Sequence, residues 1–197
     1  DPRKFGSSVD RFSLNDIVFY QHRNSDIHLI SHCDMKGYFA GLRQDLKRMT
    51  AASYAAELIE NVMAPEQQNL EIYQLMGDFL RSLQTVEDIS KLVHTFQIKI
   101  LLYSGFKPHL DSCLECGQEI QGRARFSLKS GGLICLRCPS EAFEVTLVFP
   151  GTVASILYIE KNPWARCLKL GLTAPVQRQL FFILNNFLVF HLERDLK

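Results

Sequence analysis

Strong charge imbalance and long apolar runs are both absent from this sequence, and each absence excludes a class of protein. The 22 Lys and Arg residues face 21 Asp and Glu residues, so the net charge over 197 residues is only +1. This balance excludes a histone-like polycation, although it allows a local basic face. No run reaches the roughly 18 apolar residues that a membrane span requires. The most apolar stretch, 180–190, is interrupted by Asn185 and Asn186.

Targeting and catalytic signatures are absent as well. The N-terminal residues are polar and charged, unlike a secretory signal, so we expect a cytoplasmic protein without structural disulfides. There is no glycine-rich phosphate loop, serine nucleophile elbow or His-Glu-x-x-His motif. The histidines and paired carboxylates that do occur are expected to lie on the surface: His22, His28, His32, Glu57 and Glu60. We therefore predict that the protein is not an enzyme.

Strand-like patterns are confined to the N-terminal part. Apolar residues between Phe12 and Tyr20, and again between Ile27 and Ile30, flank turn residues at 23–26. This pattern predicts a β-hairpin, which alone is only marginally stable in water. Because the sequence begins at Asp1 rather than Met, we expect partner strands upstream.

Helical periodicity dominates the rest of the chain. Apolar residues recur at spacings of three and four, Asn69 is a suitable N-cap, and Gly105 is a suitable helix stop. The last helix, capped by Thr173, is apolar almost all round. Six helices are expected to begin near residues 37, 70, 85, 152, 163 and 174.

Four cysteines interrupt this pattern as two C-x2-C pairs. Cys113 and Cys116 form the first pair, and Cys135 and Cys138 follow after 18 intervening residues. A C-x2-C pair turns the chain sharply, so that both thiolates face one ion, and two pairs complete a tetrahedral cage. The spacing predicts one structural Zn²⁺, because four cysteines leave no open position for a catalytic water.

Other interpretations of the cysteines are weaker. A thioredoxin-like redox pair requires one C-x-x-C in a βαβ context, and four reduced core cysteines do not suit the polar, glycine-rich surroundings. His109 lies just upstream and could replace one ligand. Cys33 and Cys167 have no partner at metal spacing, and we expect them to act as small apolar residues.

Several segments together resemble the RecO family of bacterial recombination mediators. The most diagnostic stretch runs from Lys99 through Gly105 and Pro108 into the first cysteine pair. Further similar segments are residues 3–6, 12–14, 42–46, 52–54, 126–127 and 131–133. The resemblance covers essentially the whole chain. It implies a protein that works with RecR, remodels single-strand-binding protein on single-stranded DNA, loads RecA and anneals complementary strands without ATP.

The residue patterns and this resemblance together predict an α+β fold. The resemblance implies the remnant of an N-terminal OB-fold β-barrel, a mainly α-helical body and an inserted four-cysteine zinc-ribbon-like module. The expected parts are residues 1–36 for the last OB-fold strands, 37–112 for the helical domain, 113–140 for the zinc module, and 141–197 for helices that complete the helical domain.

Clusters of basic residues indicate where DNA would bind. They precede the hairpin, lie in the first helix and outnumber acidic residues in the zinc module. Each cluster could also be an ordinary solvated face, and Phe126 could stack on a base or pack in the module's core. The predicted DNA contacts are Arg3, Lys4, Arg43, Lys47, Arg48, Arg123, Arg125 and Lys129.

The last helix suggests a partner site. Phe181, Phe182, Val189 and Phe190 lie off its main apolar stripe, so the helix is either deeply buried or offers an apolar slot. The resemblance implies an acidic, Phe-tipped tail of single-strand-binding protein as the occupant, with Arg178 as a basic residue at the rim.

The leading hypothesis is a non-enzymatic DNA repair and homologous recombination mediator of the RecF-pathway type. It would bind single-stranded DNA, RecR and single-strand-binding protein, act with RecA, and lie in the cytoplasm at the nucleoid. A zinc-ribbon interaction module without nucleic-acid activity is the alternative, which the neutral charge mildly favours. A metal-dependent hydrolase is disfavoured, because four cysteines would close the metal site.

Overall fold

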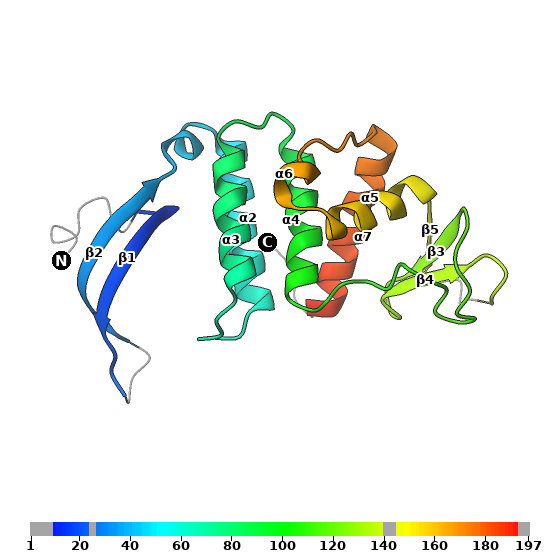
Figure 1. The fold of residues 1–197 in the computed structure, drawn as a ribbon, viewed down its shortest axis with the longest axis horizontal. Coiled ribbons are helices and arrows are strands. Elements are labelled where there is room, and N and C mark those ends of the chain that lie inside the picture. The colour runs from blue at the N-terminus through cyan, green and yellow to red at the C-terminus, as the bar shows by residue number, and fades with distance from the viewer. Residues whose placement is uncertain (1–9, 24–26, 140–144, 193–197) are drawn as a thin grey trace.

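The computed structural model describes residues 10–23, 27–139 and 145–192. A β-hairpin lies at one end of the molecule, a small three-stranded sheet lies at the other, and helices fill the space between them (Figure 1). The predicted mixture of strands with a mostly helical body is confirmed. Among the described residues, no helix has the length and apolar character needed to cross a membrane.

The N-terminal hairpin forms as predicted. Strands β1 (Ser13–Tyr20) and β2 (Leu29–Tyr38) are antiparallel, and the register shifts twice along their length. Many of their apolar side chains are exposed, such as Phe19 at 50% and Leu29 at 61%. No closed barrel occurs among the described residues, so the OB-fold assignment of residues 1–36 stays a prediction.

The first long helix begins later than predicted. Strand β2 continues to Tyr38, and a short 3-10 helix η2 (Ala40–Gln44) precedes α2 (Leu46–Val62). The expected helix start near residue 37 was wrong because Asp45 caps α2. Its carboxylate accepts hydrogen bonds from the backbone N–H groups of Lys47 and Arg48.

The other predicted helices are present. The side chain of Asn69 caps α3 by accepting a hydrogen bond from the Ile72 N–H at 2.9 Å. Asp88, rather than a residue near Thr85, caps α4. Gly105 has a φ of +83° just beyond the end of α4, as expected of a helix stop. The helices are α3 (Leu70–Leu83), α4 (Ile89–Tyr103), α5 (Pro150–Lys161), α6 (Trp164–Cys167) and α7 (Ala174–Leu192).

Helix α4 forms the centre of the core. It packs against α2, α3, α5 and α7, and it is buried continuously from His94 to Leu101. Helix α7 is not buried all round. It buries one face through Leu180, Ile183, Leu184, Phe187 and Leu188, whereas Phe181 is 61% exposed and Phe182 is 48% exposed. The sequence left two interpretations of this helix, deep burial or an exposed apolar slot. The exposure of Phe181 and Phe182 favours the exposed apolar surface.

The cysteine module is built on a sheet with the strand order β4-β3-β5. Its strands are β3 (Ala124–Ser127), β4 (Gly132–Cys135) and β5 (Val145–Val148). Strand β5 was not predicted, and it carries the sheet past the expected module boundary at 140. Phe126 is buried against Phe187 of α7, with ring centroids 5.9 Å apart, so it packs in the core.

Candidate metal centre and basic surfaces

The four cysteine sulfur atoms converge on one point. All Sγ atoms of Cys113, Cys116, Cys135 and Cys138 lie within 4.8 Å of one another. The Sγ–Sγ distance is 3.9 Å for Cys113 with Cys138, and 3.9 Å for Cys116 with Cys135. A tetrahedral zinc site with Zn–S bonds of about 2.3 Å requires about 3.8 Å between sulfurs. The four cysteines could therefore hold one metal ion, and their spacing is compatible with zinc.

Backbone N–H groups point at the first cysteine. The Cys135 N–H donates to Cys113 Sγ at 3.3 Å. Burial disfavours a charged thiolate there, but hydrogen bonds from the backbone of Cys135, Cys116 and Glu115 outweigh it and lower the pKa of Cys113 to about 6. In contrast, contacts with the Cys135 and Cys116 sulfurs raise the pKa of Cys138 to about 12. Without a cation, neighbouring thiols cannot all be deprotonated easily, because their negative charges repel one another. A bound cation would stabilise these thiolates together, because metal ligation deprotonates thiols.

Arg125 supports the second cysteine pair from strand β3. Its guanidinium donates to the carbonyl oxygen of Cys135 at 2.8 Å and to the carbonyl oxygen of Cys138. His109 lies outside the cysteine cluster, and its Nε2 is 2.8 Å from Ser112 Oγ. Cys33 and Cys167 lie in β2 and α6, also outside the cluster.

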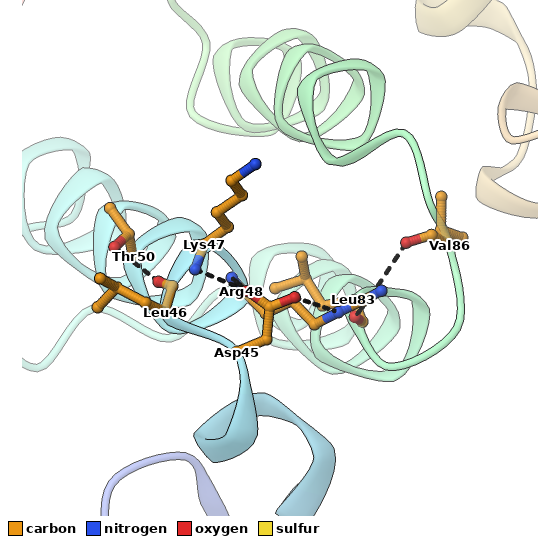
Figure 2. Close-up of polar contacts among 7 residues, drawn as sticks. All are labelled: Asp45, Leu46, Lys47, Arg48, Thr50, Leu83 and Val86. Carbon is orange, nitrogen blue, oxygen red and sulfur yellow. Dashed lines mark hydrogen bonds and ion pairs between the residues drawn. The ribbon is translucent and has the colours of Figure 1, made fainter.

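The predicted DNA contacts of the first helix differ in their surroundings. Figure 2 shows Arg48 reaching across to the end of α3, whereas Lys47 extends away from these partners. The Arg48 guanidinium donates to the carbonyl oxygens of Leu83 and Val86, and its Nε lies 3.3 Å from Asp45. Arg48 therefore holds helices together, and Lys47 is the exposed cation here.

Arg43 is also engaged within the chain. Its guanidinium forms an ion pair with Asp10 at 2.9 Å, donates to the Arg11 carbonyl oxygen and lies 4.9 Å from the centre of the Tyr38 ring. In the module, Arg123 and Lys129 are exposed. Arg3 and Lys4 lie outside the described residues. Among the predicted DNA contacts that the structure describes, Arg43, Arg48 and Arg125 are thus engaged within the chain, whereas Lys47, Arg123 and Lys129 are exposed.

A groove of about 730 Å³ lies between α2, α4 and α7. Its apolar walls include Leu46, Val93 and Phe181. A second hollow of about 590 Å³ shares Val93 and Phe181 with it and extends to Arg178 and Phe182. Arg178, predicted as a partner contact, therefore lies at one end of a long apolar groove, and Lys47 also lines it.

Polar side chains line the same groove. The Gln97 amide donates to Tyr54 Oη at 2.6 Å and to Asn185 Oδ1 at 2.9 Å. Its Oε1 lies 3.1 Å from His94 Nδ1, which makes that nitrogen the donor and places the lone pair of a neutral imidazole on Nε2. Burial lowers the pKa of His94, and the contacts with Gln97 and Asp88 offset this only in part. Sequence reasoning missed this network, because its members come from three separate helices.

The fold and the four clustered cysteines define a mainly helical protein with an inserted module that could hold a metal ion. Residues 43–197 match the family model for the C terminal of Recombination protein O. The chain is similar to DNA repair protein RecO from Alkaliphilus metalliredigens, with 32% identity over 190 residues, covering 95% of this chain and 76% of the relative. For DNA repair protein RecO from Desulforamulus reducens, the identity is 30% over 196 residues, covering 99% and 75%. The chain belongs to the RecO family, as its motifs predicted.

Proposed function

We propose that this chain is a DNA repair and homologous recombination mediator of the RecF-pathway type. It binds single-stranded DNA and partner proteins, anneals complementary strands and helps load RecA onto DNA covered by single-strand-binding protein. Its match to the RecO family along nearly the whole chain carries this proposal. It acts with RecR, in the cytoplasm at the nucleoid, and catalyses no chemical step.

The module holds one structural Zn²⁺ in this proposal. The sulfur spacing, the N–H group directed at Cys113 and the Arg125 contacts with the second cysteine pair support it. The ion takes the place of a hydrophobic core, since the cluster around Cys113, Ile134 and Cys135 is small.

The hairpin belongs to an OB-fold barrel in this proposal. Its exposed apolar side chains need a covering layer, and the chain spans about three quarters of the length of the relatives named above. Further strands in the whole protein would provide that layer.

Annealing requires only that phosphate charges on two strands be neutralised. Lys47 and Lys129 supply exposed cations for this purpose, and Arg43 keeps about a third of its side chain exposed. Counterion release gives a log–log slope of about −0.7 for each phosphate contacted on a single strand. With ~3–5 contacts, a fourfold rise in salt weakens binding by roughly 20- to 130-fold.

The test is the salt dependence of binding to a labelled oligonucleotide. Lys47→Glu should flatten the slope by about 0.7, because one phosphate contact is lost. Arg81→Glu is the control, since Arg81 is an exposed cation on α3 that pairs with Asp78. Affinity that does not change with salt would contradict the proposal and favour a zinc-ribbon interaction module without nucleic-acid activity.

The groove between α2, α4 and α7 supports a second contact, with the acidic, Phe-tipped tail of single-strand-binding protein. A phenyl ring would pack against Val93 and Phe181, and the acidic residues would face Arg178 and Lys47. Arg178→Glu should weaken binding of a labelled tail peptide, whereas Tyr158→Ala, which removes an exposed aromatic residue of α5, should not. The absence of saturable peptide binding at low salt would refute this contact.

A further inference from the structure

An exposed aromatic side chain lies beside an arginine at one end of the three-stranded sheet. The register pairs Ala124 with Val148 at the end of β3 and β5, and Arg123 and Phe149 are the next residues beyond this pair. Arg123 and Phe149 are both exposed, whereas Ala124 and Val148 beside them are buried. The Arg123 guanidinium lies 5.8 Å from the centre of the Phe149 ring, which is 40% exposed.

The backbone beneath this ring is held in place on both sides. The Gln179 side chain of α7 donates to the Leu147 carbonyl oxygen at 2.9 Å and accepts from the Phe149 N–H at 2.9 Å. Helix α5 starts at Pro150, directly after Phe149, and the proline ring fixes the φ torsion of Pro150. The Phe149 ring is therefore attached to a rigid part of the chain. Stacking of a ligand on the ring costs little conformational entropy, because the backbone there is already ordered.

A hollow of about 590 Å³ lies next to Arg123, between the loop after the first cysteine pair and the second cysteine pair. Gln118 and Gln121 line it with amide groups, and Arg137 adds a second exposed guanidinium. Glu119 also lines the hollow, so two cations face one acidic residue. This composition suits a ligand that carries negative charge and hydrogen-bonding groups.

We infer that Arg123 and Phe149 form a stacking platform for a base of single-stranded nucleic acid, with Arg137 placed to contact a backbone phosphate. The inference rests on the proposed DNA binding and names the part of the module that contacts the bases. Single-strand binders combine cationic grooves with aromatic or guanidinium surfaces on which bases stack. An acidic peptide without aromatic residues would use the two arginines but not the exposed ring. Arg125 is outside the platform, because its guanidinium holds the cysteine backbone.

Two oligonucleotides of equal length separate stacking from charge. One is oligo-dT, and the other has the same phosphates but abasic sugars. The full chain loaded with zinc should bind oligo-dT more tightly, and Phe149→Leu should weaken binding of oligo-dT by about 5- to 100-fold while leaving the abasic strand unchanged. Leucine keeps the apolar volume and removes the aromatic face. Tyr158→Leu, at a comparably exposed aromatic residue of α5, should change neither affinity.

A second variant tests the stacking platform independently, in case Phe149→Leu disturbs folding. Arg123→Lys keeps the positive charge but removes the planar guanidinium, so it should reduce the preference for oligo-dT without weakening the abasic strand. Zinc content and thermal unfolding are measured for each variant.

The possible failures are distinguishable. If the unaltered protein binds neither oligonucleotide, the proposed function is wrong and the platform is wrong with it. If it binds oligo-dT and both variants bind equally well, the platform is wrong and the proposed function stands. Equal weakening of both oligonucleotides would mean that this face recognises charge alone, as an acidic-peptide site would, and would overturn the stacking inference.

Discussion

The guanidinium of Arg48 in α2 donates a hydrogen bond to the carbonyl oxygen of Leu83, the last residue of α3. The final carbonyl groups of a helix have no partner within that helix, so an external donor satisfies one of them. A second bond, 3.1 Å long, reaches Val86 in the loop to α4. One side chain thus joins α2 to the α3–α4 connection.

Removing this side chain should destabilise the fold. We expect Arg48→Met to lower the free energy of unfolding by about 1–3 kcal/mol, since charged donors are lost from partly buried carbonyl groups. Lys47→Met is the matched control, and it should cost less than about 0.5 kcal/mol because Lys47 is exposed. Urea unfolding followed by circular dichroism measures both. Equal losses in the two variants would contradict the structural role of Arg48.

Metal removal should affect the module far more than the helical body. Purified protein should contain close to one zinc per chain, and Cys135→Ser should lose most of it and increase proteolysis within residues 113–138. The helices should remain, because their core is formed by other residues. Cys33→Ser is the control, since Cys33 lies in β2 outside the cluster. Elemental analysis that finds no zinc in protein never exposed to chelator would refute the metal assignment.

Arg125 should influence metal affinity without being a ligand. Its bonds to the carbonyl oxygens of Cys135 and Cys138 hold the second pair in position. Partners that orient metal ligands are typically worth about 10- to 100-fold in affinity, so Arg125→Met should weaken zinc binding by that amount. Competition with a chromophoric chelator measures this affinity. Arg123→Met should leave it unchanged, and a similar loss in both variants would show that only the overall charge matters.

His94 should make stability depend on pH in the mildly acidic range. Burial lowers its pKa in the folded state below the ordinary value of 6.5, so the unfolded chain takes up the proton more readily. The stability that the neutral ring contributes is therefore complete above pH 6.5 and is lost as the pH falls below that value. His94→Gln should reduce the loss of unfolding free energy between about pH 7.5 and about pH 5. A variant with the same pH dependence as the parent would contradict this role.

Local sequence signals predicted much of the fold. Asn69 and Gly105 mark helix boundaries through their own side chain or backbone preference, so they could be read without tertiary information. The cysteine pairs could be recognised in the same way, because the C-x2-C spacing is typical of metal-ligand pairs. The start of α2 was missed because apolar residues continue at helical spacing through Phe39 and Leu42, whereas the Asp45 cap decides where the helix begins.

Long-range contacts account for what the sequence could not show. Arg48 and Lys47 are adjacent cations and look alike in the sequence, yet only the fold brings Leu83 and Val86 to Arg48. Strand β5 is four residues long, and its pairing with β3 crosses an intervening segment. Neither the Arg48 contacts nor the pairing of β5 with β3 produces a periodic pattern in the sequence.

The contact between Gln179 and strand β5 also has a consequence while the chain is being synthesised. Strand β5 is one of the two outer strands of its sheet, and an open strand edge can pair with another chain. Gln179 occupies that edge at Leu147 and Phe149, but it belongs to α7, which leaves the ribosome after β5. During synthesis this edge of the sheet therefore stays uncovered until α7 emerges, and in that interval the nascent chain can pair with a neighbouring chain along β5.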